Sequence, residues 1–197
     1  VTRYTGYPVY LVTYRVGYPG VTPDALDDLA AVIRFLSDKK EETGFLPENY
    51  AIGGYSAGAN LISGWGTGNN GWKRYGLEKP RVMFPVYTFI DLKCDWIRTS
   101  DVVFLKHMFG ENFEQFLDVY NIAEHVDKDF PPCYIVCGRD DVTVPPVNSE
   151  RLKALLDKAS VPAILEEGDH APHGFGDGTG TDVEGWPERA IAFMESL

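Results

Sequence analysis

The residues best suited to chemistry lie in the stretch GGYSAGAN, residues 53–60, where Ser56 stands between Gly54 and Gly58. An apolar run precedes it and a helix-forming run follows, so the pentapeptide G-x-S-x-G falls at a strand-to-helix turn. Such a turn strains the serine backbone and raises its hydroxyl above the sheet, and we expect both glycines to be needed because side chains there would collide. The backbone N–H of Ala57, at the helix N-terminus, is then a candidate oxyanion donor.

Glycine-rich stretches of this kind also form tightly packed turns and phosphate-binding loops. The sequence has no GxxxxGK[ST] pattern, which disfavours the phosphate interpretation. A nucleophilic serine needs a base and an acid that orients the base, and at such a turn the expected chain order is serine, acid, histidine.

Two later loops supply both kinds of residue. Asp140 and Asp141 follow the apolar run CYIVC, and His170 and His173 follow a last short apolar run. Ligands of open α/β sheets bind at the carboxyl ends of the strands, so these loops and the serine turn are expected at one edge of a sheet.

The hydrophobic pattern predicts the elements that must hold these loops. Strands are expected at 8–14, 49–54, 81–89, 133–137 and 163–167. Helices are expected at 22–40, 57–64, 100–108, 113–119, 147–158 and 187–197. Pro85 marks its strand as an edge strand or a bent one. The alternation predicts an α/β fold: a three-layer α/β/α sandwich around a mostly parallel sheet, in one domain over 1–197, with a small helical cap or insertion at about 91–130.

Taken together, GGYSAGAN, GRDDVTVPPVNSERL and HGFG resemble the α/β-hydrolase fold, in the esterase branch that includes acetyl-esterases, feruloyl-esterases and hormone-sensitive-lipase-like enzymes. The family pattern D-x-x-V-P matches Asp141 rather than Asp140, and HGFG matches His173. The resemblance therefore implies a catalytic triad of Ser56, Asp141 and His173, with Tyr55 as a candidate substrate contact. It also implies cleavage of short acyl or acetyl esters, including those on carbohydrates, through an acyl-enzyme and without a metal or organic cofactor.

The sequence departs from this family at its start. The HGGG-type loop that supplies a second oxyanion donor is not found, nor are the strands that precede it. The fold is thus expected to be N-terminally incomplete, with 8–14 near an exposed sheet edge that a homo-oligomer contact would cover.

Three alternatives stay open beside the esterase. A prolyl-oligopeptidase-like serine peptidase shares the fold and similar motifs, and a non-catalytic hydrolase-like module would explain the missing loop. A metal site built from Glu166, Asp169, His170 and His173 is acceptable ligand chemistry, but it would leave the serine turn and the acid loop without a role.

Composition limits the partners. The 197 residues are 44% hydrophobic and carry a formal net charge of -11, with a sequence pI near 4.7. That charge disfavours nucleic acid and anionic membrane surfaces and leaves a small-molecule ester as the expected partner. Cys94, Cys133 and Cys137 are expected to be reduced thiols. Neither a membrane span nor a signal peptide is recognisable, so a cytoplasmic location is expected. Aromatic side chains of the expected cap fit a substrate pocket or, more commonly, a core: Trp96, Phe104, Phe109, Phe113 and Phe116, together with Met108.

Overall fold

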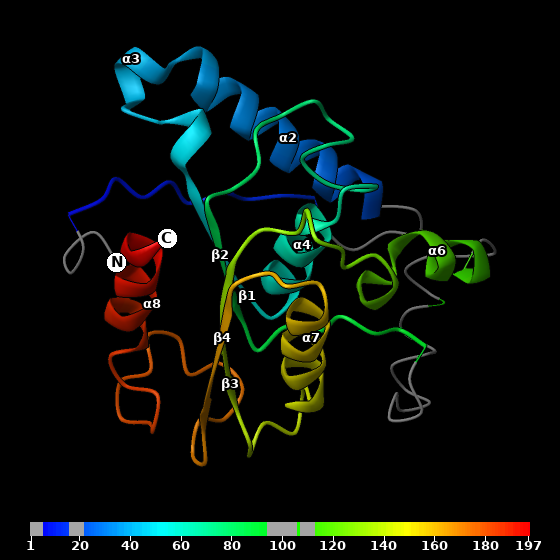
Figure 1. Cartoon of the computed structure of the whole chain (residues 1–197), viewed down its shortest axis with the longest axis vertical. Coiled ribbons are helices and arrows are strands. Elements are labelled where there is room, and N and C mark those ends of the chain that lie inside the picture. Colours follow the sequence, from blue (N-terminus) through cyan, green and yellow to red (C-terminus); the bar gives the residue numbers. More distant parts are fainter. Residues whose placement is uncertain (1–5, 16–21, 94–105, 107–112) are drawn as a thin grey trace.

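The computed structural model describes residues 6–15, 22–93, 106 and 113–197 (Figure 1). Its centre is a four-stranded sheet in the order β1-β2-β3-β4, and all three neighbouring pairs are parallel. The strands are β1 (Ala51–Tyr55), β2 (Val82–Val86), β3 (Cys133–Gly138) and β4 (Ala163–Gly168). Helices in the connections allow parallel pairing, because a chain that reverses in a tight hairpin would pair antiparallel.

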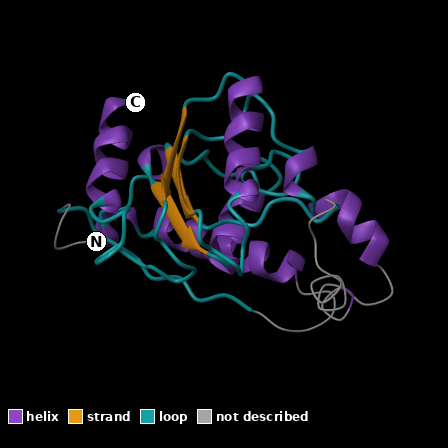
Figure 2. Cartoon of the chain, turned by 90° about the horizontal axis from the view of Figure 1, so that it is seen from below, coloured by secondary structure: helices purple, strands orange, loops and turns teal. Residues whose placement is uncertain are grey.

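Helices cover both faces of this sheet, as Figure 2 shows with the sheet seen nearly along its edge. The longer helices are α2 (Thr22–Asp38), α4 (Ala57–Gly66), α6 (Phe113–Tyr120), α7 (Val147–Lys158) and α8 (Trp186–Ser196). Short turns form α3 (Lys40–Thr43), η1 (Pro47–Asn49) and η3 (Ile122–Glu124). Helices α4 and α7 pack on one face and α8 on the other. The predicted three-layer α/β arrangement is confirmed.

The core follows from the alternation of side chains along β3. Ile135 points into a cluster with Leu152 of α7, while Tyr134 and Val136 point into a second cluster with Trp186 of α8. All six residues of β3 are buried, because both faces of an interior parallel strand are covered by helices.

Helix α2 shows the amphipathic pattern that the sequence predicts. Its apolar stripe is buried in full and packs with Trp65 of α4; the members are Leu26, Leu29, Ala30, Ile33 and Leu36. Their spacing of three and four residues places them on one side of the helix, so hydrophobic burial fixes which side faces α4.

The strand predicted at 8–14 is wrong. Residues 6–15 are extended but belong to no strand, and Leu11 is 94% exposed. They are held by side chains instead: Tyr7 donates to Glu195, Tyr10 to the carbonyl of Thr43, and Arg15 to Asp28. A β-branched, aromatic run forms a strand only when a neighbour offers a ladder, and within the described residues β1 pairs only with β2.

Of the two alternatives given for the strand that contains Pro85, the edge strand is wrong, because β2 lies between β1 and β3, and the bent strand stays a prediction. Against β1 the pairing is continuous, with Pro85 opposite Gly54. Against β3 the partners fall on either side of the proline, Met83 with Cys133 and Val86 with Val136. The missing N–H of Pro85 therefore interrupts the ladder with β3 and leaves the ladder with β1 intact, which is how an interior strand accommodates this proline.

Part of the expected cap lies outside the described residues. The helix predicted at 100–108 lies outside them apart from residue 106, as do Cys94, Trp96, Phe104, His107, Met108 and Phe109. In the described part, α6 agrees with the helix predicted at 113–119, and the Phe116 ring stacks on Tyr120 at 5.4 Å.

Cys133 and Cys137 are free and buried, and burial raises the pKa of both thiols, that of Cys137 to about 12. Within the described residues, no helix combines the length and hydrophobicity that a membrane span requires.

Candidate active site

Ser56 occupies the turn between β1 and α4 in a strained backbone conformation. Its φ is 52° and its ψ is -116°, values that a residue with a side chain rarely adopts. Main-chain hydrogen bonds hold it there: its N–H donates to the carbonyl of Val86 at 3.1 Å, and its own carbonyl accepts from Asn60 at 3.0 Å. The chain reverses so sharply that the serine hydroxyl projects beyond the carboxyl end of the strand.

The two flanking glycines have different roles. A Cβ added at Gly54 would lie 2.3 Å from the carbonyl oxygen of Gly58, closer than any real contact. A Cβ added at Gly58 would meet only the hydroxyl of Tyr14, at 3.9 Å. The expectation that a side chain would collide is therefore right for Gly54 and wrong for Gly58. The main chain of Gly58 is what a side chain at Gly54 would collide with.

The structure brings the three predicted site residues together. His173 Nε2 lies 3.0 Å from Ser56 Oγ, and His173 Nδ1 lies 2.7 Å from Asp141 Oδ2. These residues are as many as 117 positions apart in the sequence, and they meet because their loops leave the carboxyl ends of three parallel strands. Both ring nitrogens of the histidine are engaged, one by the acid and one by the hydroxyl.

Asp141 is buried, with no exposure of its side chain. A buried carboxylate requires hydrogen-bond donors, and Asp141 Oδ1 accepts the backbone N–H groups of Thr143 and Val144, each at 2.8 Å. Its second oxygen is left for His173. The loop thereby fixes the direction of the carboxylate before any substrate binds.

Asp140, the neighbouring acid, holds the two loops together instead. Its Oδ1 accepts the backbone N–H of Ala171 at 2.8 Å, two residues before His173. Its other oxygen is 3.9 Å from His170 Nδ1, and the His170 side chain is 85% exposed. Asp140 thus links the loop after β3 to the loop after β4.

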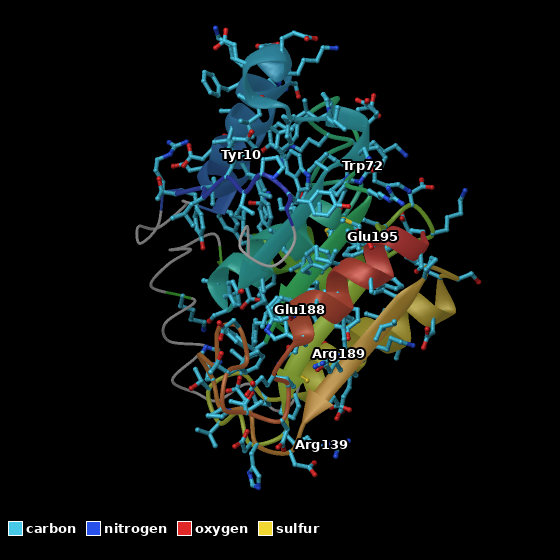
Figure 3. All side chains as sticks on the ribbon, turned by 90° about the vertical axis from the view of Figure 1, so that its left-hand side faces the viewer. Tyr10, Trp72, Arg139, Glu188, Arg189 and Glu195 are labelled. Carbon is cyan, nitrogen blue, oxygen red and sulfur yellow. The ribbon has the colours of Figure 1, made fainter. Side chains whose placement is uncertain are left out.

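The carboxylates of the alternative metal site, Glu166 and Asp169, each interact with other partners. Glu166 of β4 is bound by Tyr134 and by Arg189, which reaches it from α8 (Figure 3). Asp169 pairs with Arg139 at 2.6 Å. Among the described residues, no group of three or more histidine, cysteine or carboxylate side chains has the arrangement of a metal site.

The remaining predicted residues lie beside the serine. Ala57 is the first residue of α4, so its N–H has no partner within the helix and faces the turn. Tyr55, at the end of β1, is 41% exposed, and its ring centroid lies 5.9 Å from that of Tyr87 and 6.2 Å from that of Trp186. Burial raises the pKa of the Tyr55 hydroxyl.

Sequence reasoning missed Tyr87, which directly follows β2. Its ring centroid lies 4.6 Å from that of His173, and its φ of 41° is in the left-handed region. The available signal was its position near the carboxyl end of the strand predicted at 81–89, on the same edge where the serine, acid and histidine loops gather.

A three-layer parallel fold with a serine on a sharp strand-to-helix turn, followed in sequence by the acid and the histidine, defines an α/β hydrolase. The BD-FAE family model matches residues 2–156, and the chain belongs to that family. The match contains Ser56 and Asp141, whereas His173 lies beyond it. None of the curated proteins has a significant match to this sequence.

Solved structures agree with this assignment. An acetyl ester-xyloside bifunctional hydrolase from Caldicellulosiruptor lactoaceticus is 25% identical, with a TM-score of 0.77 over 93% of this chain and 69% of its own. A sugar hydrolase from Lactococcus lactis is also 25% identical, with a TM-score of 0.73 over 93% of this chain and 74% of its own. The carboxylesterase Cest-2923 from Lactobacillus plantarum WCFS1, 18% identical, has a TM-score of 0.73 over 92% of this chain and 70% of its own. The chain is a carboxylic ester hydrolase of the α/β-hydrolase fold.

Proposed function

We propose that this protein cleaves short acyl esters, acetyl esters in particular, through a nucleophilic Ser56, a general base His173 and an orienting acid Asp141. The observation that carries the proposal is the continuous hydrogen-bonded chain from Ser56 Oγ through both nitrogens of His173 to Asp141, with distances of 3.0 and 2.7 Å. This arrangement is the one that activates a nucleophile: the histidine contacts the serine hydroxyl through one nitrogen, and a buried carboxylate orients it through the other.

The geometry supports acyl transfer in two halves. In the first, Ser56 Oγ attacks the ester carbonyl while His173 Nε2 takes the hydroxyl proton, and the imidazolium then protonates the departing alcohol. In the second, His173 takes a proton from water as the water attacks the acyl-enzyme, and it returns that proton to Ser56 Oγ when the ester bond breaks and the acid is released. Asp141 keeps Nδ1 protonated, so that Nε2 is the free base, and it stabilises the imidazolium.

The negative charge on the carbonyl oxygen requires donors fixed in advance. The N–H of Ala57 is suited to this, because it lies next to the nucleophile at the N-terminus of α4, where the helix dipole favours negative charge. Tyr55, half-exposed beside the serine, is the proposed first contact for the substrate.

The substrate class rests on the relatives. One of them hydrolyses acetyl esters and xylosides and another is a sugar hydrolase, which favours acetyl groups carried on carbohydrates. The steps above use protein groups alone. A serine peptidase would use the same three residues, and a non-catalytic module would use none of them.

The test is hydrolysis of p-nitrophenyl acetate, butyrate and octanoate and of acetylated xylose, by the wild-type chain beside Ser56→Ala. We expect turnover that falls with acyl length and that is reduced at least ~10³-fold in Ser56→Ala, since the nucleophile is lost. Labelling of Ser56 by a fluorophosphonate, read as a mass increase on its peptide, measures nucleophilicity without reference to substrate.

The outcomes separate the candidates. Labelling without ester turnover, but with cleavage of peptide amides, would move the assignment to a peptidase. If Ser56 is not labelled and no ester is turned over, the chain is a non-catalytic module. Turnover that is unchanged in Ser56→Ala would overturn the role of the serine.

A further inference from the structure

The ring of Tyr87 packs against the imidazole of His173, although the mechanism above gives Tyr87 no task. The two ring centroids are 4.6 Å apart with an angle of 54° between the planes, and Tyr87 is only 4% exposed. Tyr87 comes from the end of β2, whereas His173 comes from the loop after β4, so the contact joins segments that are far apart in the sequence.

The backbone of Tyr87 is strained at this point. A φ of 41° is unfavourable for a residue with a bulky side chain, and such conformations persist only where the surroundings enforce them. The N–H of Tyr87 donates to the carbonyl of Val136 on β3 at 2.7 Å, which anchors the main chain to the sheet. The strained turn ends the regular strand alternation and directs the ring to the edge where His173 lies.

The ring is itself held from the far side. Phe175, two residues after His173, meets it edge to face at 4.8 Å and 87°, and the backbone of Gly176 makes a hydrogen bond to its hydroxyl. Burial raises the pKa of Tyr87, so the ring beside the histidine is a neutral phenol near neutral pH. The contact is thus a fixed, uncharged aromatic surface.

The imidazole needs such a surface for a geometric reason. Its hydrogen bonds to Ser56 and Asp141 leave from the two ring nitrogens, on opposite sides of the ring. The ring is also joined to the main chain through Cβ, and it can pivot by rotation about the Cα–Cβ and Cβ–Cγ bonds. When the ring pivots, its Nδ1–H no longer points at Asp141 and the lone pair on Nε2 no longer points at the Ser56 hydroxyl. Both hydrogen bonds weaken with this misalignment.

We propose that Tyr87 is a positioning residue that stops this pivoting and keeps the plane of His173 aligned with the serine hydroxyl. The inference rests on the proposed function of the Ser56–His173–Asp141 group and assigns a task to a residue outside it. The ring of Tyr87 carries the effect and its hydroxyl does not, because the contact with His173 is between ring faces and edges.

The test compares Tyr87→Leu, which removes the flat ring, with Tyr87→Phe, which keeps it. For p-nitrophenyl acetate we expect Tyr87→Leu to lower kcat by roughly 10- to 100-fold with KM within about threefold, because displacements of about 1 Å are that costly. Tyr87→Phe should stay within about threefold of wild type in both constants. Thermal unfolding of each variant reports separately on folding.

A second readout needs no turnover. The Nδ1 proton of His173, hydrogen-bonded to Asp141, gives a downfield proton NMR resonance that is identified by its absence in His173→Gln. We expect this resonance in the wild type and in Tyr87→Phe, and expect it to broaden through solvent exchange in Tyr87→Leu. In Phe175→Leu, which only loosens the support of the tyrosine ring, we expect an intermediate loss of kcat and intermediate broadening.

Wild-type kcat and an unchanged resonance in a folded Tyr87→Leu would overturn the proposal. If Tyr87→Leu does not fold, wild-type behaviour of Phe175→Leu in both readouts would overturn it instead. Failure of the proposed function can be distinguished from failure of this proposal. In that case the wild type would show no Ser56-dependent hydrolysis, and the NMR resonance would still test whether Tyr87 positions His173.

Discussion

At the scale of single residues, Asp140 and Asp141 are adjacent acids with different partners. Asp141 is buried and directs one oxygen to His173 Nδ1, whereas Asp140 is partly exposed and accepts a main-chain N–H from Ala171. One position in sequence thus decides whether a carboxylate faces the histidine or only ties two loops together.

The first prediction contrasts these two acids. Asp141→Asn should lower kcat by roughly 10⁴-fold, because the amide holds His173 in the tautomer in which Nε2 carries the proton. Asp140→Asn should keep most of the activity, since its amide oxygen still accepts the N–H of Ala171. Both variants are measured on p-nitrophenyl acetate. Loss in Asp140→Asn with activity retained in Asp141→Asn would show that the acid is assigned to the wrong position.

At the scale of elements, the junction of β1 and α4 depends on how closely the strand end approaches the first turn of the helix. The backbone of Gly54 is opposite that of Gly58, with no room between them for a methyl group on Gly54. This proximity allows the chain to reverse within one residue and gives Ser56 its strained conformation.

The second prediction tests this junction with two matched substitutions. Gly54→Ala should destabilise the protein by about 3 kcal/mol, because its Cβ overlaps main-chain atoms that cannot move aside. Gly58→Ala should be between neutral and about 1 kcal/mol more stable, because alanine is the better helix former and its Cβ meets no close neighbour. Urea denaturation measures both. Equal destabilisation by the two changes would contradict the asymmetry.

At the scale of the whole molecule, β1 is an edge of the described sheet, and residues 6–15 expose apolar side chains. Exposed edges and apolar segments favour association with another chain, whereas a net charge of -11 opposes it at low salt. The expectation of a homo-oligomer contact on this side stays a prediction, as do the small-molecule partner and the exclusion of nucleic acid.

The third prediction concerns that contact. Sedimentation velocity should show a concentration-dependent dimer at ~0.15 M salt, where the Debye length is about 8 Å and the charges are screened. Leu11→Lys should shift the equilibrium to monomer at no cost in folding, because Leu11 is 94% exposed. Leu46→Lys, an exposed leucine outside this segment, is the control and should leave the dimer unchanged. A monomer at every concentration would contradict the prediction.

The sequence by itself determined the four strands of the sheet, the longer helices and the chemical candidates. Local periodicity decides which side of a helix is buried, so the stripe of α2 was predictable. Short motifs at the strand ends named Ser56 and the two loops with the acids and the histidines, and the resemblance to a known family selected Asp141 and His173. The order of strands and helices also predicted the parallel sheet that brings their loops to one edge.

The tertiary structure decided what depends on contacts between distant segments. Whether 8–14 forms a strand depends on a neighbour with a free ladder, and whether Pro85 fits an interior strand depends on which side its missing N–H faces. The contact of Tyr87 with His173 exists only because two loops from different strands converge. Periodicity is a property of neighbouring residues, whereas ladders and ring contacts depend on how distant segments are placed in space.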